Sequence, residues 1–299
     1  MKSAIVCTTT ATLRQQPDDK SEMVDEALYG MEVQILEDLG DYAKVETFYR
    51  YQGYIRTEEL VCDQTLVPKW QQGTLYVISK SFADVLSAPK VQGLCLQGIT
   101  RGGCVLDLGP SEAEGWRKVG LIDGREGYTK ESFLMPMPSE PCFSSEKTET
   151  GQNCESKDNP QGDSTYAGVQ TEEVFRARLV ETAKLYLGTQ YRWGGRSPLG
   201  IDCSGLVSMA YLLNGVIIYR DAKLMEGFPL KEIAFEDKKP GDALYFPGHI
   251  AMYMGDGYYI HSTGKNGSDG VVINSLDPKD PLYREDLPGK ILATGSYFA

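Results

Sequence analysis

The sequence contains an internal repeat, and no other feature constrains the fold as strongly. Two segments, DYAKVETFYRYQGYIRTEEL ending at Leu60 and GWRKVGLIDGREGYTKESFL ending at Leu134, align with a constant offset of 74 residues. Aromatic, lysine, valine and glycine positions stay in one register, namely Tyr42 with Trp116, Lys44 with Lys118, Val45 with Val119, Gly53 with Gly127, and Tyr54 with Tyr128. Both copies hold short alternating stretches between turn residues, so the pattern predicts one small β-barrel or sandwich, present twice.

The rest of the chain has a different character. A polar stretch rich in Pro, Ser, Asn and Gly follows the repeat and is typical of a linker. Thr171 then begins an amphipathic helix, whose apolar face holds Phe175, Leu179, Ala183 and Tyr186. A second apolar helix and the short strands ALYF, HIAMYM and YYIH complete an α+β domain. The predicted division is a first barrel at 1–64, a second at 65–136, a linker at 137–168 and an α+β domain at 169–299.

Net charge and hydropathy exclude several classes of protein. The formal charge of −12 argues against non-specific binding to nucleic acid or to an anionic membrane, because both require a basic surface. The longest apolar stretch, 206–219, is interrupted by polar residues, so no membrane span is expected. The first residues lack the apolar core of a signal peptide, and a cytoplasmic location is expected unless a leader has been removed. The sequence leaves the oligomeric state open.

The only two histidines of the chain, His249 and His261, lie on either side of a Gly-Asp-Gly turn. The alternating pattern predicts a β-hairpin, and a turn centred near Gly255 would place the two histidines directly opposite each other. Side chains in that relation face the same side of the sheet, with Cβ atoms about 5 Å apart. One imidazole could then act as a general base while the other orients it.

Cys203 opens the helix GIDCSGLVSMAYLL, and two interpretations of its thiol compete. A cysteine on an apolar helix is commonly a small core residue. A thiol in the first turn, however, lies at the positive end of the helix dipole, which favours the thiolate, and a neighbouring imidazole would strengthen this effect. Zinc binding by Cys203, His249 and His261 is a third interpretation, but no carboxylate stands at a recognisable spacing to serve as general base. The sequence favours a cysteine nucleophile, with no metal and no cofactor.

Five short segments resemble the NlpC/P60 cysteine peptidases, bacterial enzymes that cut the stem peptides of peptidoglycan. They occur in the order of that family and are YRWGG (191–195), DCSGLV (202–207), KPGDALYF (239–246), GHIAMYMGDG (248–257) and HSTG (261–264). The repeated N-terminal segments resemble bacterial SH3-like domains. The resemblance implies a multidomain chain, in which two small all-β SH3-like barrels precede an α+β papain-like catalytic domain.

The resemblance also assigns roles to individual residues. It makes Cys203 the nucleophile, His249 the base and His261 the partner that orients the base. Tyr191 matches a tyrosine whose hydroxyl helps the Cys203 amide to hold the oxyanion. Asp202 and Ser204 match neighbours of the nucleophile that contact the amine and carboxylate groups of the substrate.

Two such barrels before a catalytic domain are similar to γ-D-glutamyl-L-diamino acid endopeptidases of peptidoglycan recycling, which act on peptides with a free N-terminal L-Ala. That similarity implies that Glu22 and Tyr54 of the first barrel bind the amine, although an exposed acid and a barrel-core aromatic are equally good descriptions of them. Ala222 stands where the family carries a serine, which leaves the fine specificity open. Two alternatives remain: a non-catalytic cell-wall-binding module, and an amidase or acyltransferase that uses the same Cys/His/His residues.

Overall fold

The structure, a computed structural model, describes residues 2–143 and 170–299 and divides into two compact units. One unit comprises residues 1–137 and 189–205, and the other comprises 138–188 and 206–299. Most of the predicted linker 137–168 lies outside the described residues. By this division, the segment 189–205 belongs to the compact unit of the two barrels, whereas the sequence assigns it to the α+β domain.

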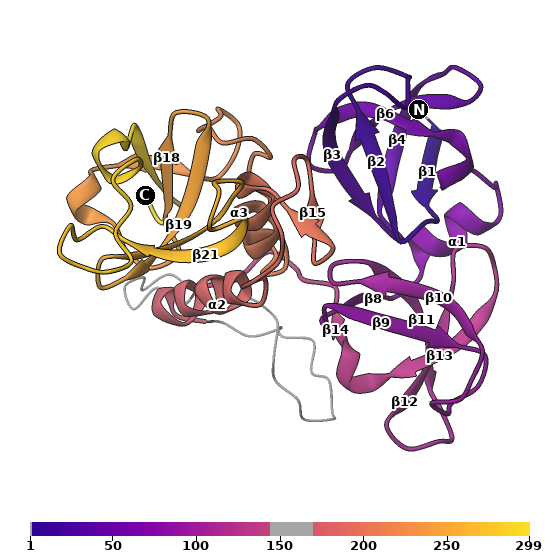
Figure 1. Ribbon diagram of the computed structural model, residues 1–299. Helices are drawn as coiled ribbons and strands as arrows, with labels where there is room; N and C mark the ends of the chain where they lie inside the picture. Colours follow the sequence, from indigo (N-terminus) through magenta and orange to yellow (C-terminus); the bar gives the residue numbers. More distant parts are fainter. Residues whose placement is uncertain (1, 144–169) are drawn as a thin grey trace, which may run out of the picture. The chain divides into compact units, whose positions relative to one another are not determined.

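The two repeats fold into antiparallel sheets of identical topology (Figure 1). The first sheet has the order β3-β2-β6-β5-β4-β1-β7 and the second has the order β10-β9-β13-β12-β11-β8-β14. Each strand of the second sheet thus occupies the place of the strand seven positions earlier. The first sheet comprises β1 (Lys2–Val6), β2 (Thr10–Arg14), β3 (Met23–Leu28), β4 (Glu32–Asp38), β5 (Tyr42–Thr47), β6 (Gln52–Arg56) and β7 (Leu60–Val61). The second comprises β8 (Leu75–Ile78), β9 (Phe82–Leu86), β10 (Cys95–Thr100), β11 (Cys104–Pro110), β12 (Trp116–Gly120), β13 (Glu126–Lys130) and β14 (Leu134–Pro136).

The register of the strands preserves the offset of the repeat. Val45 pairs with Gly53 in the first sheet, and Val119 pairs with Gly127 in the second. A Cβ atom on Gly127 would lie 2.5 Å from a side-chain carbon of Val85, so this position requires glycine. Helix α1 (Leu66–Gln72) links the two sheets within this unit, and its Trp70 donates a hydrogen bond to a backbone carbonyl of the first barrel.

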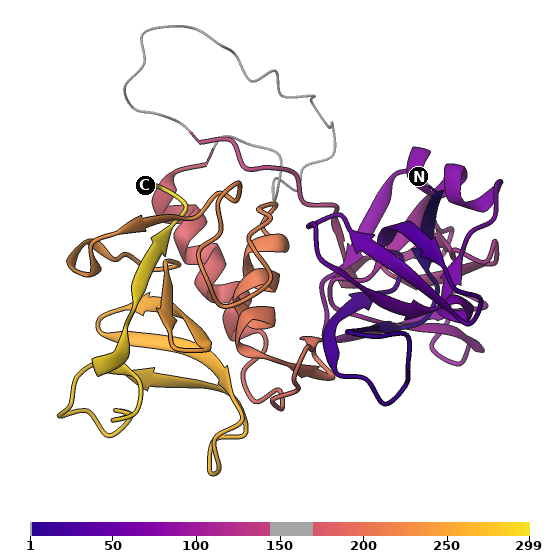
Figure 2. The ribbon, with the colours of Figure 1, turned by 90° about the horizontal axis from the view of Figure 1, so that it is seen from above.

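The second unit packs two helices against a six-stranded antiparallel sheet, whose strand order differs from the order along the chain. Figure 2 shows α2 (Glu172–Lys184) beside the body of α3 (Cys203–Leu212), and the Asn214 amide at the end of α3 donates to the Thr182 hydroxyl of α2. The Thr171 hydroxyl caps α2 by accepting from the Val174 amide, as the sequence predicts. All four residues of the predicted apolar face are buried, and the last of them, Tyr186, lies just beyond the end of α2. The sheet has the order β17 (Lys231–Ile233), β22 (Ala293–Ser296), β18 (Ala243–Phe246), β19 (His249–Gly255), β20 (Tyr258–Thr263) and β21 (Gly270–Ser275).

Candidate active site

Helix α3 begins at Cys203, and its body is a core element. Leu206, Val207, Met209 and Ala210 are fully buried, so the apolar pattern after the first turn reflects packing. Cys203 itself is 5% exposed, a value that would suit either a core residue or a nucleophile. Burial alone does not separate these two descriptions of Cys203, and the contacts around the first turn are needed to do so.

Asp202 caps the N-terminus of α3. Its Oδ1 accepts from the Gly205 amide at 2.6 Å and from the Ser204 hydroxyl at 3.2 Å. Its Oδ2 accepts from the Gly194 amide at 2.9 Å, which ties the start of the helix to the preceding loop. Both predicted substrate-binding neighbours of Cys203 thus hold the helix terminus in place, and their contacts with substrate stay a prediction.

Tyr191 precedes the nucleophile by 12 residues in the sequence, but its backbone pairs with a residue close to it. A parallel bridge pairs Tyr191 with Ile201, and the Arg192 amide donates to the Ile201 carbonyl. The short strands β15 (Arg196–Ser197) and β16 (Gly200–Ile201) close the loop between them. The backbone thus brings Tyr191 to within two residues of Cys203, and its oxyanion role stays a prediction.

The loop before Cys203 is anchored on the first barrel of the same unit. The Trp193 indole donates to Glu22 Oε1 at 2.8 Å, and Trp193 remains 57% exposed. A Cβ atom on Gly194 (φ 72°) would lie 3.0 Å from the Met23 carbonyl oxygen, so the loop backbone lies directly on the edge of β3. Glu22 is therefore close to the loop that leads to the nucleophile, which the sequence alone could not show.

Buried charges fasten the same loop to strand β3. Arg196 is 2% exposed, lies 3.8 Å from the carboxylate of Asp25, and stacks on the ring of Tyr49 with its guanidinium carbon 4.3 Å from the ring centroid. The Tyr49 hydroxyl donates to Asp25 at 2.6 Å. Glu26, next along β3, is fully buried; it pairs with Arg192 at 3.2 Å and accepts from the Arg196 amide. Burial raises the pKa of Glu26, and the charge of Arg192 opposes this shift.

Tyr54 has no comparable contact. It lies on β6, where Arg14 of β2 separates it from Met23 of β3. Within the part of the chain that the structure describes, its side chain forms no hydrogen bond with the 189–205 loop. Its amine-binding role stays a prediction that these contacts do not support. The role of Glu22 also stays a prediction, but its hydrogen bond with Trp193 places it beside the loop that leads to Cys203.

The two histidines lie on one face of the β19–β20 hairpin, but not in the predicted register. Asp256 (φ 51°) and Gly257 (φ 80°) form the turn, with Gly255 paired to Tyr258, and a bulge follows at Met254. Met252 consequently pairs with Ile260, which places position 251 rather than His249 opposite His261. The prediction that the histidines are direct partners is wrong. The prediction that they share a face is confirmed, because a shift of two residues preserves the face.

The diagonal arrangement still brings the two imidazoles into contact. His249 Nε2 lies 2.8 Å from His261 Nδ1, and the rings meet edge to face. Burial lowers the pKa of His249 to about 4, an effect that the charge of Arg284 reinforces and Asp286 opposes. Burial, followed by the charge of His249, lowers the pKa of His261 to about 3. Both rings are therefore neutral at pH 7, and a neutral imidazole can accept a proton.

The nucleophile and the base belong to different compact units. Cys203 lies in the unit of the barrels, whereas His249 and His261 lie in the other unit. The approach of His249 to the Cys203 thiol stays a prediction.

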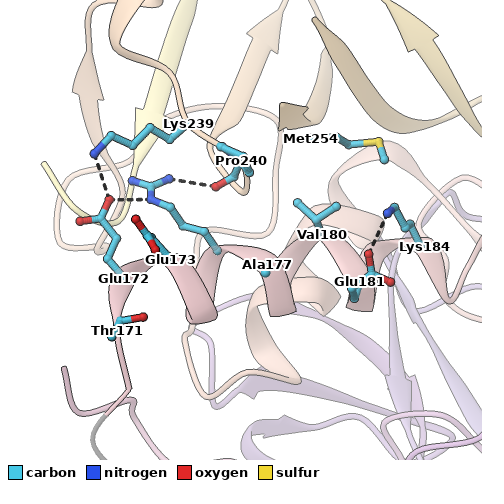
Figure 3. Close-up of a pocket in the computed structure, with 11 residues that line it drawn as sticks. Thr171, Glu172, Glu173, Ala177, Val180, Glu181, Lys184, Lys239, Pro240 and Met254 are labelled. Atoms are coloured by element: carbon cyan, nitrogen blue, oxygen red, sulfur yellow. Dashed lines mark hydrogen bonds and ion pairs between the residues drawn. The ribbon is translucent and has the colours of Figure 1, made fainter. Parts of the chain in front are cut away.

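A groove in the second unit is separate from these residues (Figure 3). It lies between α2, the Lys239–Pro240 turn and Met254, and has a volume of about 720 Å³. Three of its charges are paired with one another, since Glu172 contacts both Arg176 and Lys239. Met254 lies at the opposite end of β19 from His249, and none of the predicted catalytic residues lines the groove.

Two other kinds of site are absent from residues 2–143 and 170–299. These ranges contain no group of three His, Cys, Asp or Glu side chains that could hold a metal ion. In these same ranges, no helix is long and apolar enough to cross a membrane.

Comparison with known proteins gives matches to both parts of the chain. Residues 188–282 match the NlpC/P60 family, and residues 9–61 match the bacterial SH3 domain. The Dipeptidyl-peptidase 6 of Lysinibacillus sphaericus is 42% identical over 99% of this chain and 100% of its own length. The Gamma-D-glutamyl-L-lysine dipeptidyl-peptidase of Bacillus cereus is 28% identical over 90% of this chain and 74% of its own. The chain therefore belongs to the NlpC/P60 family.

Comparison with solved structures agrees on the fold. An NlpC/P60 family protein from Bacillus cereus ATCC 10987 superposes with a TM-score of 0.74 at 20% identity, covering 99% of this chain and 100% of the other. The predicted family and the predicted fold class, two SH3-like barrels followed by an α+β NlpC/P60 domain, are confirmed.

Proposed function

We propose that this chain hydrolyses the γ-D-glutamyl–L-diamino acid bond of stem peptides derived from peptidoglycan. The observation that carries the proposal is its 42% identity, along both full lengths, to a dipeptidyl-peptidase. A second relative, matched over most of both chains, bears γ-D-glutamyl-L-lysine in its name. The chain is an NlpC/P60 cysteine peptidase, and the substrates are peptides with the γ-D-glutamyl linkage.

The proposed mechanism uses residues of both units. His249 takes the proton of the Cys203 thiol, and the thiolate attacks the γ-carbonyl carbon of D-Glu. The oxyanion formed there is held by the Cys203 amide and the Tyr191 hydroxyl. When the C–N bond breaks, the imidazolium of His249 gives its proton to the leaving amine. A water molecule then loses a proton to His249, attacks the thioester and releases the dipeptide together with the free thiol.

We also propose that the substrate has a free N-terminal L-Ala, whose amine binds Glu22. The support is that Glu22 is an exposed carboxylate that accepts from Trp193, ten residues before the nucleophile. A carboxylate oxygen keeps further lone pairs after one hydrogen bond, so Glu22 can also accept from an ammonium group. An acetylated N-terminus would remove the positive charge and two of the donors.

Mass spectrometry of the products of defined peptides tests the reaction. L-Ala-γ-D-Glu-L-Lys and its diaminopimelate counterpart should each yield the dipeptide L-Ala-D-Glu. Cys203→Ala should abolish the release of dipeptide. Cys104→Ala is a matched control, since both cysteines are 5% exposed and burial raises the pKa of Cys104 to about 12. Equal cleavage by the Cys203→Ala variant and the wild type would refute the mechanism, and recovery of the acyl group on an added amine would indicate an acyltransferase.

The amine-binding step has its own test. N-acetylated peptides should be cleaved at least tenfold more slowly by the wild type, and Glu22→Gln should reduce this preference. Glu58→Gln, an exposed carboxylate elsewhere on the first barrel, serves as the control. Equal rates on free and acetylated peptides would contradict the role of Glu22 while leaving the cleaved bond unchanged.

A further inference from the structure

Three side chains form a line across strands β19, β20 and β21. His249 Nε2 lies 2.8 Å from His261 Nδ1, and His261 Nε2 lies 2.9 Å from Asn274 Oδ1. In the pairing of β20 with β21, Val272 is opposite His261, and Asn274 follows two residues later on the same face. Neither the family resemblance nor the sequence pattern pointed to Asn274.

The amide of Asn274 can take only one orientation. Its Nδ2 donates to the Leu282 carbonyl oxygen at 2.7 Å. A backbone carbonyl can only accept, so rotating the amide by 180° would set two acceptors against each other. The Leu282 carbonyl therefore directs Oδ1 towards His261.

The orientation of the amide determines which ring nitrogens carry protons. Oδ1 only accepts, so His261 Nε2 must be the protonated nitrogen of that ring. In a neutral His261, Nδ1 is then an acceptor, and the 2.8 Å contact requires His249 Nε2 to donate. In a neutral His249 the remaining nitrogen, Nδ1, carries no proton and is the basic atom of the ring.

We infer that Asn274 is a positioning residue that selects the tautomer of His249 in which Nδ1 is free to accept a proton. This inference rests on the proposed function for its catalytic meaning. Without the Asn274 acceptor, a neutral His261 could carry its proton on Nδ1 and donate to His249 Nε2. His249 would then hold its proton on Nδ1 and could not deprotonate a thiol with that atom.

The same line of contacts also matters after the proton has moved. When His249 Nδ1 has accepted a proton, the ring is positively charged and Nε2–H still donates to His261 Nδ1. The acceptor lone pair, held there by Asn274, stabilises this charge. Arg284 and Asp286 also act on both rings, and their charges shift the histidine pKa values in opposite directions.

Nitrogen-15 NMR of the histidine rings tests the inference without any substrate. Because the chain has only two histidines, selective labelling gives only two imidazole spin systems. At pH 7 the wild type should show one protonated and one unprotonated nitrogen in each ring, with protons on Nε2 of both. Asn274→Leu removes both hydrogen bonds of the amide and should produce a second tautomer of His261. Asn274→Asp keeps an acceptor for His261 Nε2 but sets a carboxylate oxygen against the Leu282 carbonyl, so the protons should stay on Nε2 of both rings while stability falls.

Kinetics supply the second measurement. Asn274→Leu should lower kcat by roughly tenfold to a hundredfold with little change in KM, by analogy with the loss of a residue that orients a metal-bound histidine. Asn274→Asp should restore kcat to within a few-fold of the wild type. Asn214→Leu is the matched control, since this partly buried amide also forms two hydrogen bonds within the second unit. It should reduce stability without altering the ring tautomers.

Two results would overturn the inference. One is a wild-type spectrum with the proton of His261 on Nδ1, and the other is an Asn274→Leu variant with unchanged tautomers and unchanged kcat. An inactive wild type that nevertheless shows the expected tautomers, altered by Asn274→Leu, would refute the proposed function and support the positioning role.

Discussion

Replacing Asp202 by alanine should loosen the start of helix α3 before any substrate binds. The carboxylate accepts from two buried backbone amides, those of Gly194 and Gly205. A buried donor that loses its partner costs about 1–3 kcal/mol, and hydrogen bonds to a charged acceptor lie in the upper half of that range. Two such donors give a loss of about 3–5 kcal/mol in the local stability of this turn.

Hydrogen-exchange mass spectrometry of the substrate-free protein measures this loss directly. An opening free energy lower by about 3 kcal/mol corresponds to exchange about a hundredfold faster, because each 1.4 kcal/mol is a factor of ten. The faster exchange should be confined to peptides covering 193–207. Asp202→Asn keeps one acceptor, the amide oxygen, and should show an intermediate effect.

Asp63 offers a matched control on the surface of the same unit. Its Oδ1 accepts from the amides of Thr65 and Leu66 at the start of α1, but the side chain is exposed. Water can replace it there, so Asp63→Ala should have a smaller effect on exchange in its own peptide and none around Cys203. Unchanged protection in Asp202→Ala, within a factor of three, would refute the assignment of Asp202 as the cap that holds the nucleophile's turn.

Three further results are expected. Arg196→Met removes the buried cation beside Asp25 and should lower the free energy of unfolding in urea by about 3 kcal/mol; a loss below 1 kcal/mol would contradict the anchoring role. The pKa values of His249 and His261, about 4 and about 3, lie below the usual 6.5, so the unfolded state binds more protons as pH falls from 6.5 to 5. Stability should decline there by up to about 1.4 kcal/mol per pH unit per histidine, and a His261→Gln variant with the wild-type slope would contradict this. Thr171→Ala should cost about 1 kcal/mol in the same urea assay and Thr171→Ser almost nothing, whereas equal losses would argue against the cap.

The repeat and the apolar helix face could be predicted because each depends on local patterns. Val119 pairs with Gly127 in the second barrel because the same local rules act on Val45 and Gly53 in the first. The 3.6-residue period likewise identified the buried face of α2. Such a periodic pattern lies within a single segment of the sequence, so recognising it requires no knowledge of distant contacts.

The register of the histidine hairpin was missed for a physical reason that the sequence does contain. Asp-Gly favours a two-residue turn in which both residues have positive φ, and Asp256 and Gly257 adopt it. A turn centred on Gly255 ignores that preference. The bulge at Met254 then adds one more residue, and neither propensity nor alternation predicts a bulge.

Contacts between distant segments could not be predicted at all. Arg196 and Asp25 are 171 positions apart, and neither is distinguished in the sequence from an ordinary surface charge. The sequence places Trp193 in the YRWGG segment but does not indicate Glu22 as its partner. Asn274 becomes meaningful only when the β20–β21 register is known.

The predicted catalytic residues depend on two independent sets of supporting contacts. On the side of the nucleophile, Asp202 closes the first turn of α3 and Arg196 holds the preceding loop on β3. On the side of the base, the Leu282 carbonyl orients Asn274, which in turn fixes the protons of the two rings.

The two sets share no residue and lie in different compact units, so each can be perturbed alone. We expect a change in the first set to speed exchange around Cys203 without altering the ring tautomers, and a change in the second to alter the tautomers without altering that exchange. Catalysis requires both, and for that reason a kinetic defect alone cannot assign a residue to either set, whereas the two substrate-free measurements can.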